Sequence, residues 1–326
     1  MKKTRWIAGY ILLCVGGLAL LFLPKSIRAH GSYAPVTEEH AVESVSQEGV
    51  TRVLVLGCDR SAGLTDSILI LSVEELQGQI SILQIPRDTY GEYTERDYKK
   101  LNGLLNEKGA AEAKTWLSEA LGVPLHYFLI LDLDCLGRLV DAVGGVDLEI
   151  PMELHYSDPE QHLEIHLPKG PAHLDGAGAE QFVRFRAGYA NADLGRLDAQ
   201  KQFLRALLKK CRSLSGGEQV GVMCGMLCGV RTDLDLPAAL RLMRVLDEGE
   251  REMDFPIESL PGMAVQGSSG AWYYSVNRAG AVRAINQLLF PHSPLTEDDF
   301  DPQGRLDREE HAEFHNAYIA PEESLP

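Results

Sequence analysis

Residues 52–85, which read RVLVLGCDRSAGLTDSILILSVEELQGQISILQI, decide the fold of this chain. Three runs within them, at 52–57, 67–73 and 79–85, are rich in Val, Ile and Leu, which is typical of strands buried on both faces. Residues 74–78 supply a direct turn between the second and third runs. Because such a turn joins neighbouring antiparallel strands, we expect a mixed sheet and not a purely parallel one.

The rest of the chain alternates between strand-like and helix-like patterns. Further strands are expected at residues 127–133 and 146–150, and helices at 110–121, 134–143, 177–184, 198–212, 236–249 and 279–289. Strands interleaved with helices predict an α/β fold, in which a mixed central β-sheet is covered by helices on both faces.

The N-terminal residues predict one membrane span. Lys2, Lys3 and Arg5 precede an uncharged apolar run at residues 6–23, which is near the length that crosses a bilayer. We therefore expect a short cytoplasmic N-terminus and signal-anchor at 1–24 and an extracytoplasmic linker at 25–49. A cleaved signal peptide, cut after Ala29 or Ala34, is the alternative.

The folded domain is expected at residues 50–290 and outside the cytoplasm, on a single-pass membrane protein. Residues 291–326 are rich in Asp and Glu and poor in large apolar residues, so we expect an acidic, flexible tail.

The charge balance excludes a general nucleic-acid binder. The chain carries 31 Lys and Arg against 47 Asp and Glu, a formal net charge of -16. Any phosphate binding must therefore come from a local cluster of cations. The six cysteines show no paired metal-ligand spacing, so free thiols are expected, and the sequence contains none of the common nucleotide-binding glycine motifs.

Carboxylates mark the ends of the first two expected strands. Asp59 and Arg60 follow the first strand, and Asp66 stands immediately before the second. Ligands bind at such sheet ends in α/β folds, and two carboxylates suit Mg²⁺. The alternative is that Asp59 and Asp66 only cap turns.

Cations recur at the ends of later elements. Pro86 ends the third strand and is followed by Arg87 and Asp88. Further cations and amides at comparable positions are Lys100, Arg184, Arg186, Arg196 and Gln200. Arg binds phosphate oxygens in a bidentate manner, so the set predicts one anionic ligand; a structural Arg87–Asp88 pair or a solvated basic surface is the alternative.

These residues stand in ordered blocks that resemble the LytR-CpsA-Psr (LCP) family of cell-wall glycopolymer ligases. The blocks are VLVLGCDR, LTDSILIL, ISILQIPRDTY, KKLNGL, LVDAVGGVDLEIP, LDGAGAEQFVRFR and DLGRLDAQ, within residues 50–289. The resemblance implies that Asp59 and Asp66 hold Mg²⁺. It implies that the substrate pyrophosphate is bound by Arg60, Arg87, Lys100, Arg184, Arg186, Arg196 and Gln200, with Arg87, Asp193 and Arg196 as catalytic residues.

Two positions depart from the family pattern. Leu64-Thr65 and Ala199 stand where the family usually has an Arg. The loss of two cations would weaken phosphate binding.

The function that the resemblance implies is transfer of a glycopolymer phosphate, of teichoic acid or capsular polysaccharide type, from a polyprenyl-pyrophosphate lipid to a peptidoglycan hydroxyl. Asp193 is the expected base, and Asp66 is the alternative if it is not fully committed to the metal. The lipid is expected in an apolar groove between sheet and helices, lined from residues 117–139 and 203–208. A non-catalytic binding or regulatory protein and a pyrophosphate-lipid hydrolase are the alternatives.

Overall fold

The computed structural model describes residues 49–58, 64–94, 99–158, 163–185, 193–214, 217–218, 222, 230–247, 255–267 and 270–306. The strands are β1 (Val50–Cys58), β2 (Thr65–Glu74), β3 (Gln79–Ile85), β4 (Tyr127–Asp132), β5 (Val146–Ile150), β6 (Leu154–Asp158), β7 (Leu163–Leu167), β8 (Gly170–Leu174), β9 (Val230–Thr232), β10 (Ile257–Ser259), β11 (Gly262–Gln266) and β12 (Trp272–Val276). The helices are η2 (Leu101–Gly103), α2 (Leu104–Lys108), α3 (Ala110–Leu121), α4 (Leu133–Ala142), α5 (Gly176–Arg184), α6 (Asp193–Ser213), α8 (Leu236–Asp247) and α9 (Arg278–Leu288).

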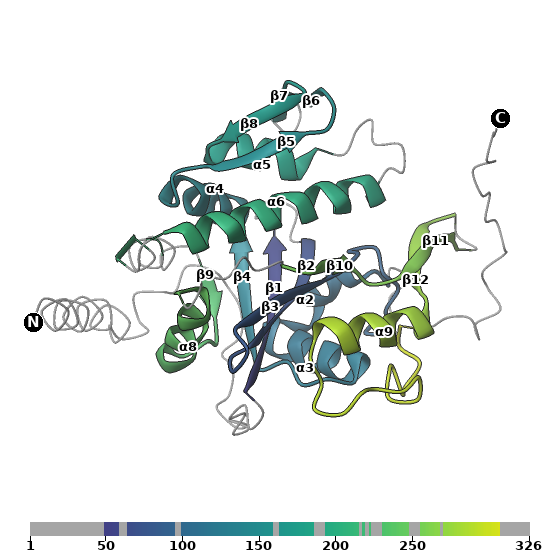
Figure 1. Ribbon diagram of the computed structural model, residues 1–326. Coiled ribbons are helices and arrows are strands. Elements are labelled where there is room, and N and C mark those ends of the chain that lie inside the picture. The colour runs from purple at the N-terminus through teal and green to yellow at the C-terminus, as the bar shows by residue number, and fades with distance from the viewer. Residues whose placement is uncertain are drawn as a thin grey trace, which may run out of the picture. The chain divides into compact units, whose positions relative to one another are not determined.

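The main sheet has the strand order β10-β3-β2-β1-β4-β9 (Figure 1). β2 pairs antiparallel with both β1 and β3, whereas β4 is parallel to β1 and β10 is parallel to β3. The expected mixed sheet is thus present. This topology brings the C-terminal ends of β1, β3 and β4 to the same edge as the N-terminal end of β2.

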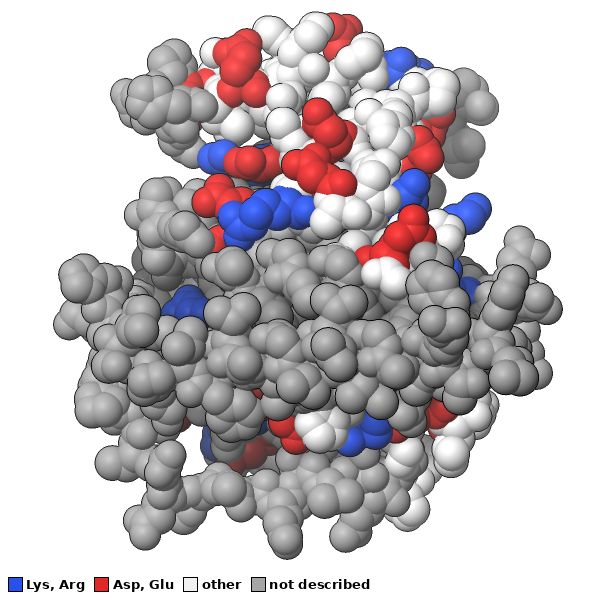
Figure 2. Space-filling view, turned by 90° about the vertical axis from the view of Figure 1, so that its left-hand side faces the viewer, with Lys and Arg blue, Asp and Glu red and all other residues white. Residues whose placement is uncertain are grey.

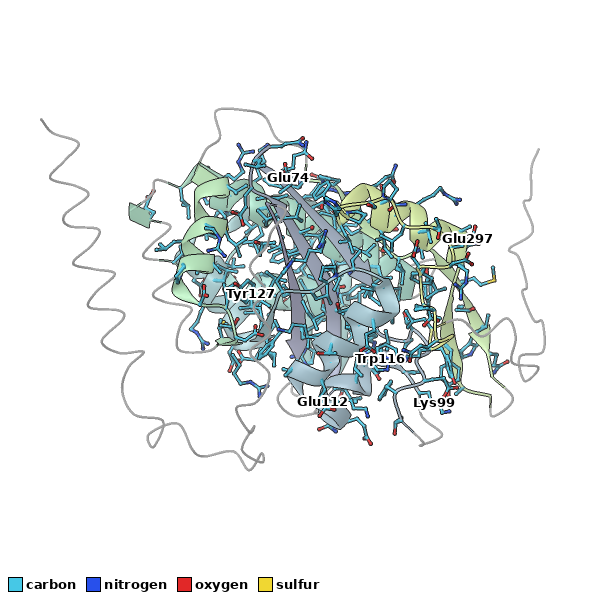
Figure 3. All side chains as sticks on the ribbon, turned by 90° about the horizontal axis from the view of Figure 1, so that it is seen from below. Glu74, Lys99, Glu112, Trp116, Tyr127 and Glu297 are labelled. Atoms are coloured by element: carbon cyan, nitrogen blue, oxygen red, sulfur yellow. The ribbon has the colours of Figure 1, made fainter. Side chains whose placement is uncertain are left out.

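Alternating side chains divide the sheet between two apolar clusters. Leu54, Ile68 and Leu83 pack with α3 and α9 on one face. Figure 3, seen from below, shows α3 with Glu112 and Trp116 lying over the strands on this side. On the other face Leu69 and Ile82 pack against residues of α6 and α8. The period-two alternation buries both faces, as the apolar strand sequences require.

A second layer lies beyond α6 (Figure 1). It contains α4, α5 and two small antiparallel pairs, β5 with β8 and β6 with β7. Its apolar cluster includes Phe182 of α5 and Phe203 of α6. Because α6 also contributes Leu204 and Leu208 to the cluster on the sheet, this helix joins the two layers.

Two boundaries differ from those expected. β4 ends at Asp132, whose side chain accepts a hydrogen bond from the backbone N–H of Cys135 at 2.7 Å and so begins α4 one residue earlier than expected. α6 begins at Asp193 and not near residue 198. Gly195 weakens the local helix propensity, but burial of Arg196 and Leu197 overrides it.

The first part of the acidic C-terminal stretch is packed, which corrects the domain end expected at residue 290. Leu295, Phe300 and Leu306 are buried in the cluster that contains α3 and α9. The backbone N–H of Asp301 donates to the carbonyl of Ala120 at 2.8 Å. Three apolar residues spaced five or six apart thus attach residues 292–306 to the domain.

The expected span at residues 6–23 and the expected linker lie outside the described residues, as does the tail beyond residue 306. Within the described ranges, no helix combines the length and apolar character needed to cross a membrane.

Candidate active site

Four polar residues converge at the shared edge of the main sheet. Cys58 is the last residue of β1, and Asp66 is the second residue of β2. Arg87 lies two residues after the end of β3, and Asp132 is the last residue of β4. Cys58 and Asp132 are direct partners in the parallel register of β1 and β4. Because β2 runs antiparallel to β1 and β3, its first residues lie beside the last residues of its neighbours. Residues far apart in sequence therefore meet at one edge, as expected for ligand sites in α/β sheets.

A pocket of about 440 Å³ opens between this edge, α6 and the second layer. Its polar lining residues are Asp66, Ser67, Asp132, Arg184, Arg196 and Gln200. Its remaining lining is largely apolar and comprises Val55, Gly57, Cys58, Leu69, Leu131, Leu136, Tyr156, Leu163, Val183, Phe203 and Leu204. The pocket can therefore accept an anionic group that carries an apolar chain.

Arg87 and Asp66 form an ion pair at the pocket. The Arg87 Nη1 lies 2.6 Å from Asp66 Oδ1, and the side chains are 17% and 32% exposed. Backbone contacts hold Arg87 in place: the Thr89 N–H and Oγ1 both donate to the Pro86 carbonyl, and the Asn102 N–H donates to the Arg87 carbonyl. The turn begun by Pro86 thus points a partly desolvated guanidinium at the sheet edge.

Lys100 is linked to Arg87 through Asp88, which contacts both side chains. Its Nζ is 3.0 Å from Asp88 Oδ1, and Asp88 Oδ2 is 4.0 Å from Arg87 Nε. Lys100 Nζ also lies 5.7 Å from the ring centre of Tyr273 on β12. Arg87 and Lys100 are brought together as expected, but neither is among the residues that line the pocket, and Arg87 contacts the lining through Asp66. The alternative Arg87–Asp88 pair is present only as this 4.0 Å contact.

Arg184 and Arg196 enter the pocket from the second layer. Arg184, at the end of α5, pairs with Glu180 one helical turn earlier at 3.1 Å. Arg196, near the start of α6, is 2% exposed. Both were expected to bind phosphate, and both line the same pocket as Asp66. A buried guanidinium keeps its charge and strengthens electrostatic contacts inside a water-poor site.

Gln200 is held by a relay of side-chain amides. Gln84 Nε2, on β3, donates to Gln200 Oε1 at 2.8 Å, and Gln200 Nε2 donates to the Val183 carbonyl at 3.4 Å. Ser259 Oγ donates to Gln84 Oε1 at 3.3 Å. Gln84 is fully buried. Gln200 lines the pocket as expected, but these contacts indicate that it mainly positions the segment before Arg184.

The structure describes the expected site residues only in part. Asp59, Arg60 and Arg186 lie outside the described residues, and for Asp193 only its position at the start of α6 is described. The expected catalytic set is therefore described for Arg87 and Arg196, and the expected metal pair for Asp66.

Asp132 and Gln84 belong to the site but were not expected there. An Asp between an apolar strand and a helical pattern is a helix N-cap signal, so Asp132 could have been found. A Gln within an otherwise apolar strand signals a buried polar contact, but its partner Gln200 is remote in sequence. The β6–β7 hairpin, which supplies Tyr156 and Leu163 to the pocket, also went unpredicted.

The expected groove is formed in part by the expected segments. Leu131, Leu136, Phe203 and Leu204 line the pocket. Leu117 instead packs on the opposite face of the sheet, within the α3 and α9 cluster. Helix α3 therefore belongs to the core and not to the groove.

Neither departure from the family pattern leaves a gap in the pocket lining. Ala199 is buried in the apolar cluster of the second layer. Leu64 precedes β2 and is not among the residues that line the pocket. The described wall of the pocket therefore contains neither of the two positions at which the family's arginine is replaced.

The described cysteines carry free thiols, as expected: these are Cys58, Cys135 and Cys211. Burial raises the pKa of the Cys58 thiol, despite the opposing contact between its Sγ and Thr65 Oγ1 at 3.9 Å. Cys58 therefore presents a neutral thiol to the pocket at neutral pH.

Comparisons with known proteins agree with this architecture. Residues 21–288 match the model of the LytR_cpsA_psr family. Among curated proteins, the polyisoprenyl-teichoic acid–peptidoglycan teichoic acid transferase TagU of Bacillus mycoides (strain KBAB4) is 27% identical over 315 residues, covering 91% of this chain and 100% of TagU. TagV of Bacillus subtilis (strain 168) is 25% identical over 314 residues, covering 91% of this chain and 80% of TagV.

Solved structures show the same fold. The crystal structure of B. subtilis TagV has a TM-score of 0.64 and 22% identity, covering 76% of this chain and 100% of the TagV chain. A TagT structure described as bound to LIIa-WTA has a TM-score of 0.61 and 22% identity, covering 83% and 99% of the two chains. Because the family model spans most of its length, this chain belongs to the LytR_cpsA_psr family.

Proposed function

We propose that this chain is a phosphotransferase that moves a glycopolymer phosphate, of teichoic acid type, from a polyprenyl-pyrophosphate carrier to a peptidoglycan hydroxyl. The observation that carries the proposal is one pocket in which an apolar lining meets Arg184, Arg196 and Asp66, with Arg87 paired to Asp66 beside it. Two relatives that this chain matches over most of their length are named as teichoic acid transferases, which supports the same class of reaction.

In the proposed reaction, the acceptor hydroxyl oxygen bonds to the sugar-proximal phosphorus of the pyrophosphate. The bond from that phosphorus to the bridging oxygen breaks, and polyprenyl phosphate leaves with the electron pair. Negative charge builds on the phosphoryl oxygens, where Arg184 and Arg196 would stabilise it. Arg87, held by its turn, would fix the phosphate beside Asp66.

The hydroxyl proton passes to a carboxylate. Asp66 lines the pocket and is one candidate base. Asp193 is the other, because its position at the start of α6 lies one helical turn before the pocket residue Arg196. Transfer by Asp193→Asn at the wild-type rate would leave Asp66 as the base.

The pocket carboxylates fit the donor chemistry of Mg²⁺. Magnesium commonly takes one or two protein carboxylates and completes its shell with water and substrate phosphate oxygens. Asp66 and Asp132 line the pocket, although in the described part of the chain no three His, Cys, Asp or Glu residues form a metal cluster. We expect Asp66, with Asp59 from the undescribed segment, to hold the ion, which would neutralise phosphate charge.

The apolar lining suits the lipid portion of the donor. Leu69 and Leu131 on the sheet line the pocket together with Phe203 and Leu204 on α6. A polyprenyl chain would bury apolar surface there while its pyrophosphate meets the arginines. Attachment to the membrane would come from the apolar run at residues 6–23, and the basic residues before it would keep the N-terminus in the cytoplasm and the domain outside.

A nucleic-acid function finds no support in the charge distribution. Figure 2 shows acidic and basic side chains intermixed on the upper part of the face that it presents. Nucleic-acid binding needs a surface dominated by Lys and Arg, and the net charge of this chain is -16.

The decisive experiment is a transfer assay with the full-length chain in detergent, a short-chain polyprenyl-pyrophosphate disaccharide, a peptidoglycan oligomer and Mg²⁺. Mass spectrometry should detect a glycan-phosphate adduct on the oligomer, greatly reduced in Arg196→Ala. Lipid binding without an adduct would identify a binding protein, and free glycan phosphate without an adduct would identify a hydrolase. Chelation of divalent ions should abolish transfer, and Mg²⁺ should restore it.

A further inference from the structure

The β6–β7 hairpin carries two histidines directly opposite each other. In its antiparallel register His155 pairs with His166, flanked by Tyr156 opposite Ile165. Alternation along the strands turns Tyr156 and Leu163 toward the pocket, which both residues line. His155 and His166 therefore lie on the other face of the hairpin, where both are exposed.

The two imidazole rings lie within reach of one ion. Their centres are 5.8 Å apart and their planes are inclined by 85°. An ion bound to an imidazole nitrogen at about 2.0–2.1 Å lies roughly 3.2 Å from the ring centre, so two rings at a tetrahedral angle about one ion have centres about 5.2 Å apart. The observed separation is 5.8 Å, so a small rotation of the side chains would be needed to direct both nitrogens at a shared ion.

The ring nitrogens of this pair are available. Among the described residues, neither ring of His155 or His166 makes a hydrogen bond or an ion pair, whereas His173 Nδ1 lies 2.7 Å from Asp147 Oδ1. His126 Nδ1 likewise accepts from the Arg52 N–H at 3.0 Å. The hairpin pair thus differs from histidines that hold a structural contact.

The next rung of the hairpin places a carboxylate on the same face. Ser157 is opposite Glu164, and Ser157 Oγ donates to Glu164 Oε2 at 2.8 Å. A negative charge one rung away favours a divalent cation. Imidazole nitrogens select Zn²⁺, Ni²⁺ or Cu²⁺, whereas Mg²⁺ prefers oxygen.

We propose that His155 and His166 form a two-histidine site for Zn²⁺ or a chemically similar divalent transition ion, with water completing the shell and Glu164 nearby. The ion would clamp β6 to β7. Because the reverse face of this hairpin forms a wall of the pocket, binding would also order Tyr156 and Leu163. The site is separate from any magnesium site at Asp66 and does not depend on the proposed transferase reaction.

Calorimetric titration of the full-length chain without an affinity tag tests the site, with ZnCl₂ as the probe and MgCl₂ as the ion control. We expect saturable Zn²⁺ binding whose affinity falls at least tenfold in His155→Gln and in His166→Gln. His173→Gln is the matched control, since this exposed histidine lies opposite Asp147 and not opposite a second histidine, and it should bind like the wild type.

Thermal unfolding gives a second readout that does not depend on activity. Zn²⁺ should raise the melting temperature of the wild type and of His173→Gln, but not that of the double variant His155→Gln/His166→Gln. Absence of saturable binding to the wild type would overturn the proposal. Equal binding by the wild type and the double variant would also overturn it, by assigning the ion to other ligands.

Discussion

Replacement of Arg87 by alanine should reduce both transfer and stability, for two separable reasons. The substitution removes the guanidinium that we propose to bind phosphate and leaves the Asp66 carboxylate without its 2.6 Å partner. Loss of one donor that stabilises transition-state charge costs about 10²–10³ in rate, or about 2.7–4 kcal/mol. We therefore expect a rate loss of this size for Arg87→Ala in the transfer assay.

The stability cost follows from the exposure of the pair. Fully exposed pairs contribute about 0.2–1 kcal/mol, and removal of one partner from a fully buried pair costs about 3–5 kcal/mol. Side-chain exposures of 17% and 32% place this pair between these limits. We expect the free energy of unfolding, measured by urea denaturation, to fall by about 2 kcal/mol.

Two further variants separate the reasons. Asp66→Asn in the Arg87→Ala background should recover part of the stability, because the unpartnered charge is gone. It should recover none of the transfer, because the arginine is still missing and Asp66, the expected Mg²⁺ ligand, is now lost as well. Lys114→Ala is the matched control: Lys114 Nζ lies 2.6 Å from Asp233 Oδ2, with exposures of 19% and 32%, at the opposite edge of the sheet. Normal transfer by Arg87→Ala, or an equal transfer loss in Lys114→Ala, would refute the assignment.

Four other predictions test the fold and the pocket. Gln84→Leu should lower transfer and destabilise by about 1–3 kcal/mol in urea unfolding, because Gln200 loses its buried donor. Arg52→Leu should lower the melting temperature strongly, since its buried guanidinium donates to the carbonyls of Leu289 and Phe290, each at 2.6 Å; unchanged melting would contradict this role. Ala199→Arg, which restores the family cation, should destabilise by several kcal/mol by placing a charge in an apolar cluster, and raised transfer at unchanged stability would oppose this reasoning. Burial raises the pKa of Cys211 from 9.0 to about 11, so the unfolded thiol ionises first and stability should fall as pH rises from 9.0 to 11, less steeply in Cys211→Ala.

The main sheet was predictable because its strands are long and apolar. β1, β2 and β3 are buried on both faces, so their sequences contain continuous runs of Val, Ile and Leu. These runs mark where the three strands lie. β8, with the sequence GPAHL, contains two residues that strands usually avoid and is held by its pairing with β5. Short strands of this kind depend on tertiary partners, which local pattern does not reveal.

The site was predictable where it coincides with strand ends and not where it depends on packing between layers. Asp66 and Arg87 stand at ends of apolar runs, so their meeting at one edge follows from strand direction. Whether Gln200 binds phosphate or positions the chain depends on Gln84, whose contact with it spans 116 residues. Within residues 117–139, Leu131 and Leu136 line the pocket and Leu117 does not. This difference likewise depends on which face of the sheet α3 covers.

Helix α6 explains why the pocket combines charge with an apolar lining. Arg196, Gln200, Leu204 and Leu208 follow one another at intervals of four, so they form one stripe along the helix. The first three line the pocket, and the stripe changes along the helix from a cation through an amide to apolar side chains. The neighbouring stripe, Phe203 and Leu207, packs into the second layer and fixes the rotation of the helix. A substitution that rotates α6 would therefore move Arg196, proposed to bind the phosphate, together with Leu204, proposed to contact the lipid. Both halves of the proposed substrate would then lose contacts at once.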